Sequence, residues 1–302
     1  MPRYLGVDGG GTKTAFVVID EHGHPVAEAT GPTLYAFPAD EGLIRRVLAD
    51  GIAATGVDPA EVEAAFFALP GYGESTADLP VLERVPGEVL GHDRYTVGND
   101  MVAGWAGSLG GADGINVVAG TGSIAYGEWQ GRSGRAGGWS EVFGDEGSGY
   151  WTAVRGLNAF SRMSDGRLPR GPLHERIKAA VGAADDLDVI GVVVGGWAND
   201  RTRLAALSSP VVEAADAGDE VAARIVLEAG VELAALVQAV RGKLEVPAGK
   251  RLPVSYSGGM FAAPAVLAAF TAALGADVEL VEPMVGPAVG AALCARRRAL
   301  GI

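Results

Sequence analysis

Three consecutive glycines, Gly9, Gly10 and Gly11, constrain the fold more than any other feature of this sequence. They lie between two short apolar runs, 4–5 and 15–19, and this pattern predicts a strand, a tight turn and a second strand. Glycine has no side chain to bury and loses much conformational entropy on folding, so packing does not explain three of them in a row. We therefore expect a turn whose backbone approaches another molecule closely.

The residues around the glycines favour a polyphosphate as that molecule. Thr12, Lys13 and Thr14 offer two hydroxyls and an ammonium group beside the backbone N–H groups of the turn. Asp8, at the end of the first strand, is placed for a hydrated Mg²⁺ ion that bridges phosphate oxygens. A plain glycine-rich hairpin turn is the alternative. A Rossmann nucleotide site is disfavoured, because a strand rather than a helix follows the turn.

Composition limits the class of protein and its partners. A chain of 302 residues with 48% hydrophobic residues predicts two domains. The net charge of −13 disfavours nucleic acid and anionic membranes as partners. The single cysteine, Cys294, excludes an internal disulfide framework, and the longest uncharged apolar run, 189–198, is too short to span a bilayer. We expect a cytoplasmic protein.

The opening pattern occurs a second time. An apolar run at 115–119 leads into the turn Gly120, Thr121, Gly122 and Ser123, and a further apolar run follows at 124–126. A repeated strand, turn and strand indicates a duplicated domain. The two turns are then expected to hold one phosphate chain from opposite sides, and the pair is more specific than either turn alone.

Two carboxylates, Asp100 and Asp145, are candidates for active-site groups. Asp100 comes directly after the strand at 95–97, and the carboxyl ends of strands are common places for active-site groups. Its alternative role is the N-cap of a helix at 101–108. Asp145 lies in the glycine-rich irregular stretch 137–148, where its alternative role is a helix-start charge on the macrodipole.

A third glycine signal lies near the C-terminus. The strand at 253–257 ends in Gly258, Gly259 and Met260, a junction that lets a flat ring lie against the backbone. A plain tight turn is the alternative. Other parts of the chain read as scaffold: Asp40 is expected to cap a helix, 172–244 is mostly helical, and the last helix covers 287–298.

In this order the motifs resemble the N-acetylglucosamine kinases of the BadF/BadG/BcrA/BcrD ATPase family, within the actin, hexokinase and sugar-kinase superfamily. The resemblance covers nearly the whole chain, and its most specific part is the Gly-Gly-Trp and Gly-Asp-Glu-Gly-Ser-Gly-Tyr-Trp stretch that ends at Trp151. It implies an α/β fold, a duplicated actin-like (ribonuclease H-like) two-domain sugar-kinase fold with an interdomain cleft. The expected domains are 1–110 and 111–302, with a closing helix at 286–302 that packs back on the first.

The resemblance also implies a role for each motif. ATP would be held by two phosphate turns and an adenosine pocket: Gly10, Gly11, Thr12, Lys13, Thr14, Gly120, Thr121, Gly122, Ser123, Gly258, Gly259 and Met260. The sugar would contact Tyr35, Gly71, Asn99, Asp100, Gly138, Trp139 and Asp145. Asp8 would position Mg²⁺, and Asp100 would be the general base, which is sufficient for phosphoryl transfer.

The implied activity is ATP-dependent phosphorylation of an amino sugar, with N-acetylglucosamine at its 6-hydroxyl as the expected substrate and the sugar 6-phosphate and ADP as products. Glucosamine kinase and broad-specificity hexokinase are the alternatives. A dehydratase-activating ATPase is disfavoured because Cys294 alone cannot hold an iron–sulfur cluster. A non-catalytic sugar sensor is disfavoured because Asp8 and Asp100 are both present. The expected partner is a small-molecule sugar; a homodimer is one option, and the sequence leaves the oligomeric state open.

The chain departs from the family pattern at the expected edge of the sugar pocket. Leu34 and Tyr35 stand where many relatives carry Asn, and Pro70 replaces a small or hydroxylated residue. An apolar edge accepts an N-acetyl methyl group but does not stabilise a bare ammonium. We therefore expect N-acetylglucosamine to be preferred over glucosamine, unless Glu74 or Glu146 reaches that edge.

Overall fold

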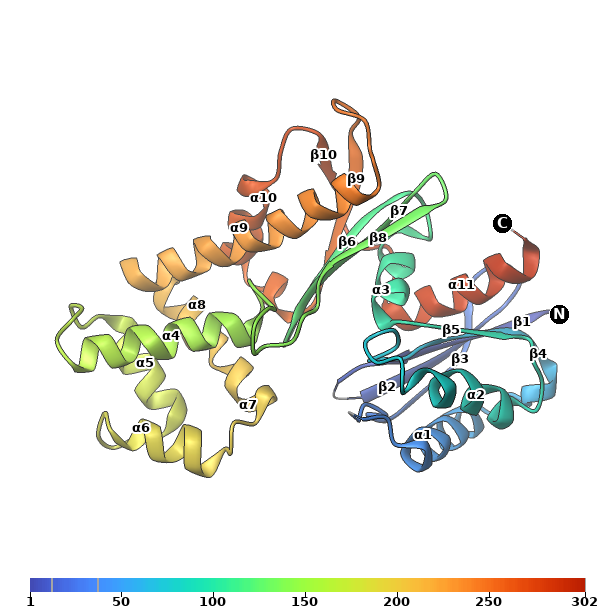
Figure 1. Ribbon diagram of the computed structural model, residues 1–302, viewed down its shortest axis with the longest axis horizontal. Helices are drawn as coiled ribbons and strands as arrows, with labels where there is room; N and C mark the ends of the chain where they lie inside the picture. Colours follow the sequence, from blue (N-terminus) through green and yellow to red (C-terminus); the bar gives the residue numbers. More distant parts are fainter. Residues whose placement is uncertain (12, 37, 302) are drawn as a thin grey trace. The chain divides into compact units, whose positions relative to one another are not determined.

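The computed structural model describes residues 1–11, 13–36 and 38–301. The chain forms two compact units, each built on a five-stranded sheet (Figure 1). Unit 1 consists of Met1–Asn116 and Glu282–Ile302, and unit 2 consists of Val117–Val281. Unit 1 thus extends past residue 110, where the sequence placed the boundary, and it includes the C-terminal helix.

The sheet of unit 1 has the strand order β3-β2-β1-β4-β5. The strands are β1 (Arg3–Gly9), β2 (Lys13–Ile19), β3 (Pro25–Pro32), β4 (Val62–Ala68) and β5 (Tyr95–Gly98). The first three form an antiparallel meander, whereas β1 pairs with β4, and β4 with β5, in parallel. The carboxyl ends of β1, β4 and β5 therefore meet at one edge of the sheet.

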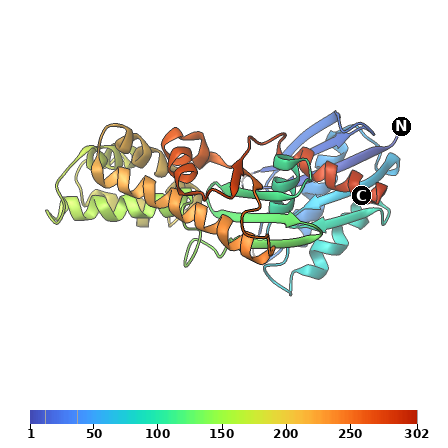
Figure 2. The ribbon, with the colours of Figure 1, turned by 90° about the horizontal axis from the view of Figure 1, so that it is seen from above.

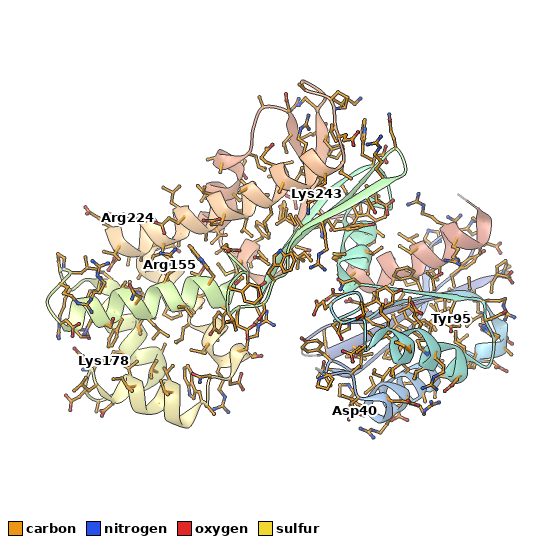
Figure 3. The ribbon with its side chains drawn as sticks, in the orientation of Figure 1. Asp40, Tyr95, Arg155, Lys178, Arg224 and Lys243 are labelled. Carbon is orange, nitrogen blue, oxygen red and sulfur yellow. The ribbon has the colours of Figure 1, made fainter. Side chains whose placement is uncertain are left out.

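Helices cover both faces of this sheet. One face is packed by α1 (Glu41–Ala54) and α2 (Leu79–Leu90), and the other by α3 (Asp100–Leu109) and α11 (Pro287–Leu300). A short 3₁₀ turn, η1 (Pro59–Glu61), precedes β4. Asp40 accepts a hydrogen bond from the Leu43 N–H at the start of α1, which confirms the predicted cap (Figure 3).

Two glycines allow α11 to lie very close to the elements that carry the site. A Cβ atom at Gly6 of β1 would lie 2.2 Å from the backbone N of Ala292. A Cβ atom at Gly290 of α11 would lie 2.2 Å from the carbonyl oxygen of Ala103 in α3. Neither neighbour is a flexible side chain, so only glycine fits, and α11 fixes β1 and α3 against each other.

The sheet of unit 2 repeats the arrangement of unit 1. Its strand order is β10-β9-β6-β7-β8, which matches β5-β4-β1-β2-β3 strand for strand. The strands are β6 (Gly114–Ala119), β7 (Ser123–Trp129), β8 (Arg132–Gly137), β9 (Leu252–Ser257) and β10 (Val278–Leu280). The shared order confirms the duplication predicted from the two glycine turns.

The helices of unit 2 form a layer on the sheet and a separate bundle. They are α4 (Gly149–Ser164), α5 (Pro172–Val181), α6 (Asp188–Ile190), the π-helix η2 (Gly191–Gly196), α7 (Arg201–Ala206), α8 (Ser208–Asp216), α9 (Glu220–Lys243), the 3₁₀ turn η3 (Gly259–Ala262) and α10 (Pro264–Ala273). The long helix α9 packs along β7 and β8 (Figure 2). Within the described ranges, no helix has the length and apolar character needed to cross a bilayer.

We predict that Gly290→Ala lowers the free energy of unfolding by at least about 1 kcal/mol, because the new methyl group must displace the backbone of α3. Gly242→Ala is the matched control: its Cβ atom would meet nothing within 4 Å, and alanine is the better helix former. Chemical denaturation of both variants measures the difference. Equal stabilities would contradict the close approach of α11 to α3.

Candidate functional site

Two carboxylates lie at the carboxyl edge of the unit 1 sheet. Asp8 is the penultimate residue of β1, and Asp100 is the first residue of α3, two positions after the end of β5. Burial and, to a smaller extent, the nearby Asp100 raise the pKa of Asp8 to about 7, and Lys13 opposes this rise. Burial also raises the pKa of Asp100 to about 6, with a further contribution from Glu74. Carboxylates that repel each other in this way favour a bound cation.

The donor set suits a magnesium ion that keeps most of its water. In the described part of the chain, no group of three or more His, Cys, Asp or Glu side chains is arranged to hold a metal ion. Mg²⁺ commonly takes only one or two protein carboxylates and fills its other positions with water and substrate phosphates. Asp8, with Asp100 beside it, fits that requirement.

Asn99, rather than Asp100, caps helix α3. The Asn99 Oδ1 atom accepts a hydrogen bond from the Met101 N–H at 3.1 Å, and its Nδ2 atom donates to the Tyr72 carbonyl at 3.0 Å. The alternative role of Asp100 as the N-cap is therefore wrong. Asn99 was expected to contact the sugar, but its side-chain amide is buried and bonded within the protein.

The turn between β1 and β2 is held tightly by its neighbours. The Gly10 N–H donates to the Lys13 carbonyl at 2.9 Å, and the Thr33 hydroxyl donates to the Gly10 carbonyl at 2.9 Å. A Cβ atom at Gly9 would lie 2.7 Å from Cδ of Pro70, so this glycine is needed for packing. Gly11 and Lys13 are exposed, which leaves the tip of the turn open to a ligand.

Two hydroxyls expected to hold phosphates are used inside the protein instead. Thr14 is fully buried, and its hydroxyl donates to the Pro32 carbonyl at 2.9 Å. Ser123 is 3% exposed, and its hydroxyl donates to the Glu146 carbonyl at 2.7 Å. Both hydroxyls fix the first part of a hairpin strand rather than face a ligand. Thr12 lies outside the described residues.

Tyr35 and Gly71 are neighbours in unit 1. Gly71 has a φ of +80°, and a Cβ atom there would lie 3.6 Å from Cε2 of Tyr35 and 4.0 Å from Oε2 of Glu74. Leu34 is different, since it is only 2% exposed and belongs to the core under α1 and α2. The expectation that Leu34 borders a sugar pocket is therefore wrong.

The second glycine turn, residues 120–123, is fixed to the start of α4. The Gly149 N–H donates to the Gly120 carbonyl at 2.8 Å, and the Tyr150 N–H donates to the Thr121 carbonyl at 3.2 Å. The first N–H groups of α4 thus hold the backbone carbonyls of this turn in place.

The junction after β9 lies against the same turn. Gly258 has a φ of +99°, and a Cβ atom there would lie 2.5 Å from the Ala119 carbonyl oxygen. Gly259 is exposed and has open space at its Cβ position. Met260 is 5% exposed and belongs to the core.

The loop at 138–148 displays an aromatic ring and buries an acid. The Gly138 N–H donates to the Ser123 carbonyl at 2.8 Å, and the next side chain, Trp139, is 62% exposed. Asp145 is 2% exposed and has a φ of +58°, which is strained for a residue with a side chain. Ser148 is the N-cap of α4, so Asp145 is not a helix-start charge.

Asp145 has a cationic partner that the sequence analysis missed. The Arg201 Nη2 atom lies 2.6 Å from Oδ2 of Asp145. Burial raises the pKa of Asp145, and the guanidinium of Arg201 acts in the opposite direction. No signal in the sequence indicates this pair, because 56 positions separate the two residues.

Comparison with known proteins places the chain in a family. The BadF/BadG/BcrA/BcrD ATPase family matches residues 5–295. The chain is 28% identical to an N-acetyl-D-glucosamine kinase of Dictyostelium discoideum over 97% of both proteins. It is 29% identical to an N-acetylmuramic acid/N-acetylglucosamine kinase of Clostridium acetobutylicum over 86% of both.

Solved structures show the same fold. A candidate N-acetylglucosamine kinase from Chromobacterium violaceum superposes with a TM-score of 0.75 at 25% identity, covering 98% of this chain and 99% of that one. A ROK family glucokinase from Streptomyces griseus superposes with a TM-score of 0.58 at 20% identity, covering 97% and 98%. The expected duplicated actin-like sugar-kinase fold is thereby confirmed.

We predict that Thr14→Val lowers the free energy of unfolding by about 1–3 kcal/mol, because the Pro32 carbonyl loses its buried donor. The KM for nucleotide should change less than about 3-fold, since a buried hydroxyl contributes no phosphate contact. Denaturation and steady-state kinetics measure the two effects. A KM for nucleotide raised tenfold with normal stability would return Thr14 to the phosphate site.

Proposed function

The chain belongs to the BadF/BadG/BcrA/BcrD ATPase family, and on that premise we propose that it is a kinase that transfers the γ-phosphoryl group of ATP to an amino sugar. The observation that carries the proposal is the position of Asp8 and Asp100 beside the β1–β2 turn. The two relatives named as N-acetylglucosamine kinases support the sugar class.

Asp100 is the general base in this proposal. It accepts the proton of the sugar hydroxyl that attacks the γ-phosphorus, while the bond from the γ-phosphorus to the bridging oxygen breaks and ADP leaves. A pKa of about 6 suits this task, because the carboxylate is mostly ionised near pH 7 yet is more basic than an ordinary aspartate. Asn99 orients the start of α3 and thereby places Asp100.

The phosphates are assigned to the two glycine turns. In unit 1 the backbone of Gly10 and Gly11 and the ammonium of Lys13 are available, and Thr12 remains assigned to the same turn. In unit 2 the hydroxyl of Thr121 is half-buried at the turn in front of α4. Bound Mg²⁺, held through Asp8, would neutralise charge on the phosphate oxygens. Gly258 and Gly259 supply a backbone surface for the adenosine.

Each unit has groups that are proposed as sugar contacts. In unit 2, Asp145 accepts hydrogen bonds from ring hydroxyls, and the exposed Trp139 beside Gly138 offers an apolar ring surface. In unit 1, Tyr35 and Gly71 border the sugar near Asp100. N-acetylglucosamine is the proposed substrate, and its primary 6-hydroxyl is the proposed acceptor.

Steady-state kinetics with a panel of hexoses, amino hexoses and N-acylated amino hexoses test the proposal. We expect ADP formation that depends on the sugar and has its highest kcat/KM with N-acetylglucosamine. ATP turnover that no sugar in the panel increases would contradict the proposal. N-Acetylmuramic acid belongs in the panel, because the Clostridium acetobutylicum relative is named for both sugars.

We predict that Asp100→Asn lowers kcat at least ~10²-fold and changes the KM values for ATP and sugar only a few-fold, because a general base acts in the transition state. The helix should remain intact, since Asn99 supplies its cap. Asp93→Asn, at an exposed position before β5, is the control and should behave like the wild type. A nearly normal kcat in folded Asp100→Asn would remove Asp100 from the chemistry.

We predict that N-acetylglucosamine is preferred over glucosamine at least ~10-fold in kcat/KM. Tyr35 keeps the edge near Gly71 partly apolar even though Leu34 is buried, and a bare ammonium loses hydration there. Competition between the two sugars at equal concentration measures the ratio. Faster phosphorylation of glucosamine would indicate that a carboxylate, with Glu74 as the nearest candidate, faces the C2 substituent.

A further inference from the structure

Arg201 bridges two of the three acidic residues of the 138–148 loop, Asp145 and Glu141. Its Nη2 atom donates to Oδ2 of Asp145 at 2.6 Å, and its Nε atom lies 3.1 Å from Oε2 of Glu141. The Asp145 side chain is 3% exposed, whereas the Arg201 side chain is 37% exposed. One guanidinium therefore reaches from solvent into the site and contacts a buried carboxylate.

The start of helix α7 fixes the position of Arg201. Arg201 begins the helix α7, and the Asp200 carboxylate caps that helix by accepting hydrogen bonds from the Thr202 and Arg203 N–H groups at 2.9 and 3.0 Å. The two residues before Asp200, Ala198 and Asn199, both have left-handed backbones, with φ of 48° and 61°. This conformation is strained for Ala198, which has a side chain but no polar group to stabilise it.

The pair also contacts the second phosphate turn. A Cβ atom at Gly122 would lie 2.6 Å from Oδ2 of Asp145 and 2.7 Å from Nη2 of Arg201. A larger residue at position 122 would push the carboxylate and the guanidinium away from the turn. Asp145 is therefore held between this turn and Arg201, and its side chain cannot rotate freely.

The charges around Asp145 decide whether it can accept hydrogen bonds. Burial raises its pKa, Arg201 and the Ser123 backbone N–H oppose this rise, and Glu141 adds to it. Among the described residues, Arg201 and Glu141 are the charged side chains that act on Asp145. Without the guanidinium, a buried carboxyl beside Glu141 would hold its proton to higher pH. A protonated Asp145 has lost part of its capacity to accept hydrogen bonds from hydroxyls.

We propose that Arg201 is a positioning residue for sugar recognition: it orients Asp145 and keeps it ionised, so that the carboxylate can accept hydrogen bonds from the ring hydroxyls. The inference rests on the proposed sugar-kinase function. It adds to that function the cationic side chain of Arg201 in α7, which lies outside every motif of the sequence. Arg201 acts through Asp145 and Glu141 and makes no contact of its own with the reacting atoms.

Three variants test the proposal by kinetics. Arg201→Met removes the charge and keeps an unbranched apolar side chain; Arg201→Lys keeps the charge but lacks the fork that contacts two carboxylates. Arg203→Met is the matched control on the same helix, because the ion pair of Arg203 is with Asp200, at 3.9 Å, and not with the loop. The KM values for sugar and ATP, kcat, and the pH dependence of kcat/KM for the sugar are measured for each.

We expect Arg201→Met to raise the KM for sugar at least ~10-fold and to leave the KM for ATP within about 3-fold. The acid limb of kcat/KM should move to higher pH, because the pKa of Asp145 rises when the guanidinium is lost. In Arg201→Lys the acid limb should lie close to that of the wild type, whereas the KM for sugar should stay raised. Arg203→Met should match the wild type. An unchanged KM for sugar, equal rises in both KM values, or equal behaviour of Arg201→Met and Arg203→Met would overturn the proposal.

A thermal unfolding cycle separates this inference from the proposed function. It compares Arg201→Met, Asp145→Asn and the double variant, and it requires no substrate. We expect the effect of Arg201→Met on the melting temperature to shrink or change sign in the Asp145→Asn background. Additive effects would overturn the pairing itself. A wild type without sugar-dependent ADP formation would overturn the proposed function, and the cycle would still decide whether Arg201 controls Asp145.

Discussion

Parallel pairing of β1, β4 and β5 is the constraint on which the site of unit 1 depends. It brings the carboxyl ends of three strands, from residues far apart in the sequence, to one edge of the sheet. Asp8 and Asp100 lie at that edge, partly removed from water, and their raised pKa values record the cost of holding two acids there. Gly6 and Gly290 stabilise this part of unit 1, because they let α11 pack closely against β1 and α3.

Much of this could be predicted because the decisive signals are local. Asp40 precedes an amphipathic run and caps α1, as its sequence position indicates. The glycine turns at 9–11 and 120–123 each interrupt apolar runs, which gives two hairpins and hence the duplication. The carboxylate of Asp100 follows a strand, and such positions often carry active-site groups.

Other features could not be predicted, since they depend on tertiary contacts. The sequence does not show that Thr14 and Ser123, at matching places in the two hairpins, turn their hydroxyls inward to carbonyls. β8 (Arg132–Gly137) contains glycines and arginines instead of an apolar alternation, so its pairing with β7 is what makes it a strand. Arg201 meets Asp145 only because α7 folds back onto the loop at 138–148.

The proposed phosphoryl transfer requires little covalent chemistry from the protein; it requires a base, a cation and groups that position two substrates. Phosphorus–proton correlation NMR of the product formed from MgATP and N-acetylglucosamine tests this account most directly. The account predicts a phosphate ester whose phosphorus couples to the two protons on C6, formed in equal amount with ADP. Free inorganic phosphate formed at the same rate with and without the sugar would contradict it.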